Sequence, residues 1–407
     1  MSKKIKAVVL SVSVLLVLFA VIGGLNVRAA SNDGAYRQLG VYSEVLSRIR
    51  SEYVEEPNIP QVTDGALHGL LESLDPNSSY LTPDEYKQYK DHKTSAKGNI
   101  GVAMSKRFGY AAVISVLPGS PADKAGVEGT DIVEAINGKT TRDMSLAEID
   151  DLLAGDPGSK IELSLVRARR AEPLKLTVIR GMVTVPPVSD KLMDDGIGYI
   201  KVDQFNKGKA QEIAAKIKDL TGKGAKRFIL DLRDCADGDE DEGIATANLF
   251  LDHGTITYLQ GQRYPRQTFT ADSSKSVTNL PLVVIVNRDT AGAAEIVAAA
   301  ILQNNRGDVL GDKTFGVGSV QKVIEIPDGS ALILSVAKYY SPNGDAIQDK
   351  QVTPNILVAD NTDDSAVPDE DDNAAPPTDE ELKKQQRPLQ DDDQLQRAIQ
   401  VLKNRKA

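Results

Sequence analysis

The chain has 407 residues and a formal net charge of −10, from 48 lysines and arginines against 58 aspartates and glutamates. This length predicts about two to four domains. An acidic chain is expected to bind nucleic acid poorly, because affinity for phosphates comes from clustered lysine and arginine. A single cysteine, Cys235, excludes an intramolecular disulfide, and three scattered histidines argue against a zinc site. We therefore expect no nucleic-acid partner, no metal and no cofactor.

The N-terminal segment, residues 1–30, has the pattern of an export signal. Three lysines within the first six residues precede an uncharged run over 7–25, and small residues around Ala29 fit a signal-peptidase site. The run is also long enough to span a bilayer, so a cleaved signal peptide and a retained membrane anchor both stay open. Either one places the body of the chain beyond the membrane, in the periplasm or another extracytoplasmic compartment. Membrane contact is expected through residues 7–25 alone.

Residues 31–94 are predicted to form a helical region. Apolar side chains recur there every three or four positions, at Leu39, Tyr42, Leu46, Ile49 and Tyr53. Such a stripe either docks on the core of its own chain or forms a seam with a second copy. A second helix is expected to end at the turn formed by Asp75-Pro76-Asn77.

Residues 95–183 are predicted to form a separate unit of short strands and one helix. Asn137-Gly138 indicates a tight turn, and Ser145 with Glu148 forms a capping box at the start of the helix. Three segments occur in the order found in PDZ domains: GNIGVAM (98–104), LPGSPADKAGV (117–127) and DIVEAINGK (131–139). The unit resembles a PDZ domain along its whole length.

The resemblance to a PDZ domain implies a peptide-binding function. PDZ domains bind the C-terminal end of an extended peptide by strand addition, and backbone N–H groups of a glycine-containing loop hold the carboxylate. Carried over to this chain, those donors are Ile100, Gly101 and Val102. The alternative is a packing domain without a ligand, in which Gly101 serves only the backbone turn.

From residue 184 to 359, strands and helices alternate. Near-continuous apolar runs predict strands that are connected by crossover helices in a partly parallel sheet. The predicted strands are 196–202, 227–233 and 281–287, the predicted helices are 210–220 and 291–302, and a hairpin turns at 327–329.

The chain resembles the C-terminal processing peptidases, or tail-specific proteases, which join a PDZ domain to a hydrolase with a Ser/Lys dyad. Besides the PDZ unit, the matching motifs are LDPNSSYL (74–81), GIGYIKVDQF (196–205), DLRD (231–234), VNRDTAGAAEI (286–296), TFGVGSVQ (314–321) and YYSPNGDAIQDKQVTPNI (339–356). The implied fold class is α+β and multidomain. It comprises N-terminal helices, a β-barrel-like PDZ domain and a mixed α/β peptidase-like core.

The resemblance also identifies the positions of the catalytic dyad. In the family, a serine at a strand-to-helix turn attacks the peptide, and a buried lysine acts as its base. Here those positions hold Gly292 and Val317, and only the glutamine that orients the lysine is kept, as Gln321. Glycine has no side chain to attack a carbonyl, and valine cannot accept a proton. The resemblance therefore implies a serine peptidase family member that has lost its catalytic groups.

The oxyanion hole is altered as well. The resemblance assigns its two N–H donors to Gly238 and Ala293. Asp237 stands where the family has glycine, and a carboxylate about 4 Å from a developing oxyanion would cost roughly 4 kcal/mol at an effective dielectric near 20.

Other residues near these positions offer weaker alternatives. Thr290 or Ser319 could serve as a nucleophile with Lys313 as its base, but neither inherits the required geometry. Cys235 is interpreted as a small buried residue. The acidic run over 237–242 lacks the spacing of a calcium loop and is interpreted as a solvated loop.

The C-terminal region changes character after Ala359. Residues 360–390 are acidic and contain proline, a composition typical of a disordered linker. A short amphipathic helix is predicted within 391–407, where Leu395, Ile399 and Leu402 form its apolar face. We expect this helix to dock on its own chain or on a second subunit.

Three functions follow from these patterns. The first is an exported, inactive pseudopeptidase that captures C-terminal tails of envelope proteins as an adaptor, or that regulates an active relative or a second copy of itself by assembly. The second is an active endopeptidase that cleaves near C-termini with a non-standard nucleophile. The third is a purely structural interaction protein.

Overall fold

The computed structural model describes residues 33–93, 98–107, 109–142, 144–167, 172–359 and 392–404. The predicted export segment and the predicted acidic linker lie outside these residues, so both stay predictions. The chain divides into two compact units, residues 1–67 and 68–407. Among the described residues, no helix has the length and apolar character needed to cross a bilayer.

The first unit contains helix α2 (Asp33–Glu52) and the start of helix α3 (Ile59–Glu72). The predicted apolar stripe lies on α2 except for Tyr53, which follows the end of the helix; Leu39 is 59% exposed, Tyr42 40% and Tyr53 62%. The helix is stabilised locally by ion pairs from Arg48 to acids one turn away on either side.

The second unit, which starts within α3, contains an element that the sequence did not predict. Asp75 accepts hydrogen bonds from the backbone of Asn77 and Ser78, which forms the expected turn after α3. The chain then forms strand β1 (Ser79–Leu81) before helix α4 (Pro83–Lys93). The prediction of helices throughout 31–94 is therefore wrong at β1, which is buried and pairs with a strand far along the chain.

The PDZ-like part is a sheet in the order β2-β3-β4-β6-β7, with β5 paired to β4. Its strands are β2 (Val102–Arg107), β3 (Tyr110–Val116), β4 (Ile132–Ile136), β5 (Lys139–Thr140), β6 (Lys160–Val166) and β7 (Leu174–Ile179). It has two helices rather than the expected one, α5 (Pro121–Ala125) and α6 (Leu146–Leu153). The capping box predicted at the start of α6 is confirmed.

The core contains a six-stranded sheet in the order β17-β14-β13-β10-β9-β8. Its strands are β8 (Ser189–Met193), β9 (Ile197–Lys201), β10 (Arg227–Asp231), β13 (Leu282–Val286), β14 (Asp308–Gly311) and β17 (Ile356–Leu357). All neighbours are parallel except β8, which runs antiparallel to β9. The expected partly parallel sheet is confirmed.

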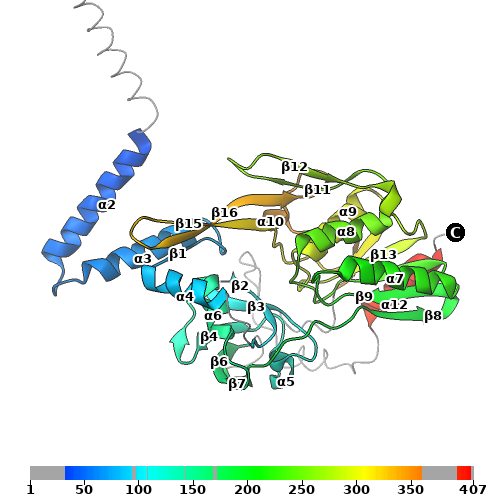
Figure 1. Ribbon diagram of the computed structural model, residues 1–407, viewed down its shortest axis with the longest axis horizontal. Helices are drawn as coiled ribbons and strands as arrows, with labels where there is room; N and C mark the ends of the chain where they lie inside the picture. Colours follow the sequence, from blue (N-terminus) through cyan, green and yellow to red (C-terminus); the bar gives the residue numbers. More distant parts are fainter. Residues whose placement is uncertain are drawn as a thin grey trace, which may run out of the picture. The chain divides into compact units, whose positions relative to one another are not determined.

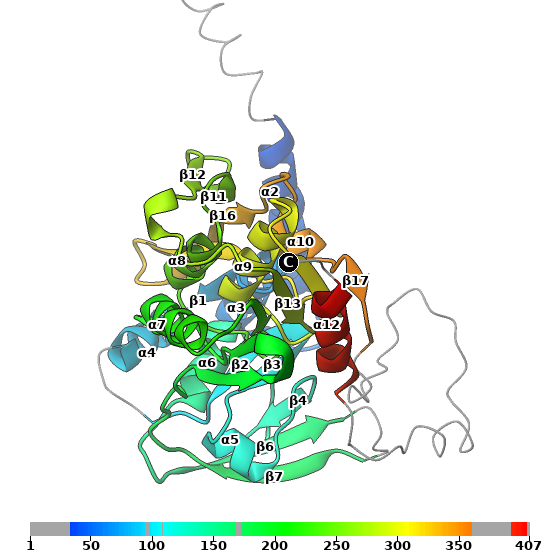
Figure 2. The ribbon, with the colours of Figure 1, turned by 90° about the vertical axis from the view of Figure 1, so that its right-hand side faces the viewer.

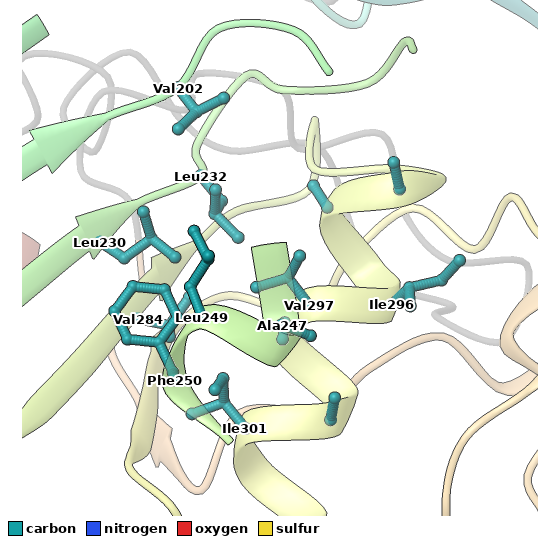
Figure 3. Close-up of a cluster of buried hydrophobic side chains, with 14 of the residues drawn as sticks. Val202, Leu230, Leu232, Ala247, Leu249, Phe250, Val284, Ile296, Val297 and Ile301 are labelled. Carbon is teal, nitrogen blue, oxygen red and sulfur yellow. The ribbon is translucent and has the colours of Figure 1, made fainter. Parts of the chain in front are cut away.

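Helices cover both faces of this sheet (Figure 1). On one face lie α7 (Lys209–Gly222), α8 (Glu240–Phe250) and α9 (Ala293–Gln303). Figure 3 shows Leu230 and Val284 of the sheet packed with Phe250 of α8 and Val297 of α9. This cluster positions the start of α9, where the candidate site lies.

The opposite face is covered by helix α12 (Asp393–Asn404). Its Ala398 and Leu402 are fully buried against Ile229 and Val283, and Figure 2 shows α12 and α7 on opposite sides of β13. The helix predicted at the C-terminus thus docks on its own chain.

A second sheet of the core is antiparallel and joins distant parts of the sequence. Strands β1, β16 (Ala331–Tyr340), β11 (Thr255–Gln260) and β12 (Gln267–Thr270) lie in this order, and β15 (Ser319–Glu325) pairs with β16. The predicted hairpin between β15 and β16 is confirmed. Short elements complete the fold: η1 (Asp194–Gly196), η2 (Ser273–Lys275) and α10 (Ile347–Lys350).

The acidic run does not form a solvated loop, which corrects the sequence interpretation. Asp239 is the N-cap of α8 and accepts a hydrogen bond from the Asp241 N–H, while Glu240 and the acids after it form the first helical turn. Acids are stabilising there because the N-terminus of a helix carries partial positive charge. Glu242 also accepts hydrogen bonds from the N–H groups of Gly208 and Ala210, which start α7.

Candidate functional site

The position assigned to the nucleophile lies at a sharp turn between β13 and α9. Gly292 precedes the helix with φ 61° and ψ −122°, a conformation that glycine adopts far more readily than other residues. A Cβ atom added at this position would meet no heavy atom within 4 Å. The turn would therefore direct a side chain into open space at a helix N-terminus, but glycine provides none.

The position assigned to the base holds an apolar residue, Val317, and its neighbours are apolar as well. A small apolar cluster consists of the buried residues Ile114, Ala236 and Ala291, and Ala103, Phe315 and Val317 pack against it. Ile114 and Ala103 belong to the PDZ-like sheet, and the other members belong to the core. The side chain at position 317 thus contributes to packing between the two parts.

Glu295 connects the two dyad positions and was not singled out by sequence reasoning. Its carboxyl accepts hydrogen bonds from the N–H groups of Gly292 at 3.0 Å, Gly316 at 2.9 Å and Val317 at 2.8 Å, and from the Thr314 hydroxyl. It is fully buried. Burial raises the pKa of Glu295 to about 7, although its hydrogen bonds favour the ionised form.

The oxyanion donor assigned to Gly238 is already occupied. The N–H of Gly238 donates to Oδ1 of Asp237 at 2.8 Å, and the Gln204 amide donates to Oδ2 of the same carboxylate at 2.7 Å. The second assigned donor, Ala293, is the first residue of α9. The carboxylate of Asp237 therefore lies where a working site would bind the negative oxygen of an intermediate.

The retained glutamine has polar neighbours of its own. Gln321 lies on β15 and donates from Nε2 to the Ser319 hydroxyl at 2.8 Å and to the Ser335 hydroxyl at 3.4 Å. Ser319 in turn accepts a hydrogen bond from Asn77 at 3.1 Å. The side chain that orients a lysine in the resembled family here forms part of a hydroxyl network.

The alternative nucleophiles are engaged elsewhere. The hydroxyl of Thr290 is fully buried and donates to the Leu232 carbonyl at 2.8 Å, while Lys313 is exposed. Cys235 is fully buried, and burial raises the pKa of its thiol above the ordinary range, which keeps it protonated and unreactive. The geometry supports none of these residues as a replacement.

The glycine loop of the PDZ-like part is also occupied by a neighbouring side chain. Oδ1 of Asn99 accepts hydrogen bonds from the N–H groups of Ile100 at 2.6 Å and Gly101 at 3.1 Å. These are two of the three donors that the resemblance assigns to a peptide carboxylate; the third, Val102, begins β2. Gly101 has φ 81°, and a Cβ there would collide with Ser120, so the loop requires glycine.

Two cavities lie along β2. The first, of about 230 Å³, opens at the glycine loop and is bordered on the core side by Asp203, Gln204 and Asp237. The second, of about 440 Å³, lies between β2 and α6 and is bordered by Met104 and Asp150, among others. Within the described part of the chain, no group of His, Cys, Asp and Glu side chains is arranged to hold a metal ion.

Comparison with known families identifies both parts. A family model described as peptidase family S41 matches residues 196–358, and a PDZ domain model matches residues 113–167. The first match covers the strands of both core sheets except β1 and β8, and the second falls on the unit that contains α6.

Comparison with known proteins shows similar relatives. A carboxy-terminal-processing protease of Bartonella bacilliformis is 31% identical over 338 residues, which cover 82% of this chain and 78% of the relative. The carboxy-terminal processing protease CtpA of Bacillus subtilis is 33% identical over 330 residues, covering 81% of this chain and 70% of the relative. The solved structure of a photosystem II D1 C-terminal processing protease matches with a TM-score of 0.65 and 25% identity, covering 78% of this chain and 92% of that one.

Proposed function

The chain belongs to peptidase family S41, among the carboxy-terminal processing proteases, and from this premise we propose that this member binds peptide tails without cleaving them. The observation that carries the proposal is the pair Gly292 and Val317, which hold the dyad positions without a nucleophile or a base. Backbone hydrogen bonds to Glu295 keep both positions in place, so the fold of the site persists without its chemistry.

The oxyanion region supports the same conclusion independently. Catalysis needs a free donor at the point where negative charge develops, and removal of one such donor costs about 10²–10³ in kcat. Here a carboxylate accepts from Gly238 N–H. A site with this arrangement repels the charge that a working peptidase must stabilise.

Binding is proposed for the groove between β2 and α6. The strand β2 forms one edge of its sheet, so its outer backbone groups are available to an added peptide strand. We assign the ligand to C-terminal tails of exported proteins, and the role to an adaptor or to a regulator of an active relative or of a second copy. The lysine-flanked apolar run at residues 7–25 supports export of the chain.

Cleavage near C-termini is the second candidate function, because the relatives are named as proteases. It would require a nucleophile outside the family positions, and Thr290 is the nearest one in sequence. Its hydroxyl is buried and hydrogen-bonded. A purely structural role has less support than tail binding, because the groove is bordered by cavities.

Two measurements with the full-length protein test the proposal. The first follows hydrolysis of a fluorogenic peptide with an apolar C-terminus; we expect no turnover above buffer, and turnover that Thr290→Ala abolishes would establish the second candidate function. The second measures fluorescence anisotropy of a labelled peptide as free acid and as C-terminal amide. We expect the free acid to bind more tightly, and equal affinities would refute tail binding.

A further inference from the structure

The groove along β2 has a defined direction for an added strand. A peptide whose carboxylate binds the loop at Ile100 and Gly101 continues along the outer edge of β2. Successive side chains of an extended strand point to opposite sides. The C-terminal side chain of the peptide would face the PDZ-like sheet and α6, so the penultimate side chain would face the opposite wall.

That opposite wall is acidic. The cavity at the glycine loop is bordered on the core side by Asp203, Gln204 and Asp237, and among the described residues that line it there is no lysine or arginine. Lys201 is close to Asp203, at 4.0 Å, and offsets part of its charge. The partners of Asp237, by contrast, are the neutral donors Gly238 N–H and Gln204.

A third carboxylate extends the acidic character along the groove. Asp150 lies on α6 and borders the second cavity together with Met104 of β2. Loss of hydration and, to a smaller extent, repulsion from Asp237 together raise the pKa of Asp150 to about 6. Asp150 therefore adds a third carboxylate to the lining of the two cavities along β2.

We propose that the groove selects C-terminal tails with a lysine or arginine at the penultimate position, and that Asp237 determines this preference. The proposal rests on the proposed tail binding and specifies its ligand. A cation there would lie in the cavity that holds Asp237, where its charge is complementary and where an acidic side chain would add to the existing repulsion. Such partly exposed pairs contribute modestly, so the effect is a preference rather than an absolute requirement.

The test uses three labelled peptides that differ only at the penultimate residue, as lysine, glutamine or glutamate, each made as free acid and as amide. Fluorescence anisotropy with the full-length protein gives the dissociation constants. We expect the lysine peptide to bind about tenfold more tightly than the glutamate peptide. The difference should shrink as salt is raised, because screening weakens exposed ion pairs.

Two variants assign the effect to its residue. Asp237→Asn keeps an oxygen acceptor for Gly238 N–H, removes the charge, and should reduce the tenfold difference to about threefold. Asp194→Asn removes one charge from an exposed site in η1, and should leave the difference unchanged. Thermal unfolding of both variants checks that each remains folded.

The outcomes separate the inference from the proposal beneath it. If free acids bind better than amides but the glutamate peptide binds as tightly as the lysine peptide, the preference is wrong and tail binding stands. The preference is likewise wrong, and tail binding stands, if Asp237→Asn leaves the difference at tenfold. If none of the three peptides prefers the free acid, tail binding itself is wrong.

Discussion

Oδ1 of Asp237 accepts a hydrogen bond from the backbone N–H of Gly238 at 2.8 Å. This N–H is one of the two donors assigned to the oxyanion hole, so the carboxylate replaces the anion that the hole would bind. Asn99 stands in the same relation to the glycine loop, where its Oδ1 accepts from Ile100 and Gly101. In both loops to which the resemblance assigns anion binding, the backbone donors are thus occupied by the side chain that immediately precedes them.

Restoring the dyad alone should not restore catalysis. The double variant Gly292→Ser with Val317→Lys provides both groups. A Cβ at position 292 meets nothing within 4 Å, but the φ of 61° strains the backbone of any residue other than glycine there. Because Asp237 still occupies Gly238 N–H, we expect Asp237→Gly in addition to raise kcat by about 10²–10³. Peptide hydrolysis under saturating substrate measures this, with Asp237→Gly alone as an inactive control. Equal activity of the double and triple variants would show that the carboxylate does not obstruct the site.

Removing the amide side chain of Asn99 should strengthen tail binding. Asn99→Ala frees the donors of Ile100 and Gly101, so a peptide carboxylate no longer competes with a tethered oxygen. We expect about threefold to tenfold tighter binding of a free-acid peptide, corresponding to about 0.7–1.4 kcal/mol, and no change for its amide. Asn99→Asp is the matched control, since it keeps the acceptor, adds negative charge and should weaken binding. An equal gain for acid and amide would contradict this account.

The sequence predicted those elements whose signals are local. The capping box of Ser145 and Glu148, the apolar strands of the core and the helix after Asp393 all depend on residues within one or two turns of each other. Strand β1 was missed because its three residues form a strand only by pairing with β16, about 250 positions away.

The sequence assigned residues to the candidate site but did not predict its hydrogen bonds. Motifs located Gly292 and Val317. The hydrogen bond from Gly238 N–H to the Asp237 carboxylate, by contrast, depends on the loop conformation that tertiary contacts impose. The acidic run was misassigned because composition does not reveal that Glu242 meets the start of α7. Glu295 carried a signal that was not used: it is the one charged residue of helix α9, in which every other residue before Gln303 is apolar.

Titration of Glu295 should make the protein less stable as the pH rises. Burial raises its pKa from the ordinary value of 4.5 to about 7, so the folded state binds a proton more tightly than the unfolded state. The stabilisation is complete below pH 4.5 and is lost as the pH rises through 7, by up to about 3 kcal/mol. Urea unfolding between pH 5 and pH 8 measures this loss.

The variant Glu295→Gln isolates this contribution. It removes the titrating group and should flatten the pH dependence of the free energy of unfolding over the same interval. Because the amide nitrogen cannot accept from the N–H groups that the carboxyl now binds, the variant should also be less stable at every pH. The slope, not the mean stability, is therefore the informative quantity, and an unchanged slope would assign the titration to another group.

Helix α12 should contribute strongly to the stability of the core. Leu402 is fully buried, with 0% solvent exposure. It packs with Ile229 and Val283 on the sheet face that α12 covers. Leu402→Ala should lower the free energy of unfolding by about 2–5 kcal/mol, because the truncated side chain leaves a cavity. Gln400→Ala, on the exposed face of the same helix, has comparable helix propensity and should change stability by less than about 0.5 kcal/mol.

Polar contacts hold the same helix at both ends. Both terminal nitrogens of Arg233 donate hydrogen bonds to the Asp392 carboxylate at 2.8 Å, and Arg227 donates to the Leu402 carbonyl at 2.8 Å. If α12 were held by these contacts alone, Leu402→Ala would be nearly neutral while Asp392→Ala would be severe. Urea unfolding of the two variants beside Gln400→Ala distinguishes these cases. We expect the larger loss from Leu402→Ala, since the Asp392 carboxylate is partly exposed and water weakens its ion pair.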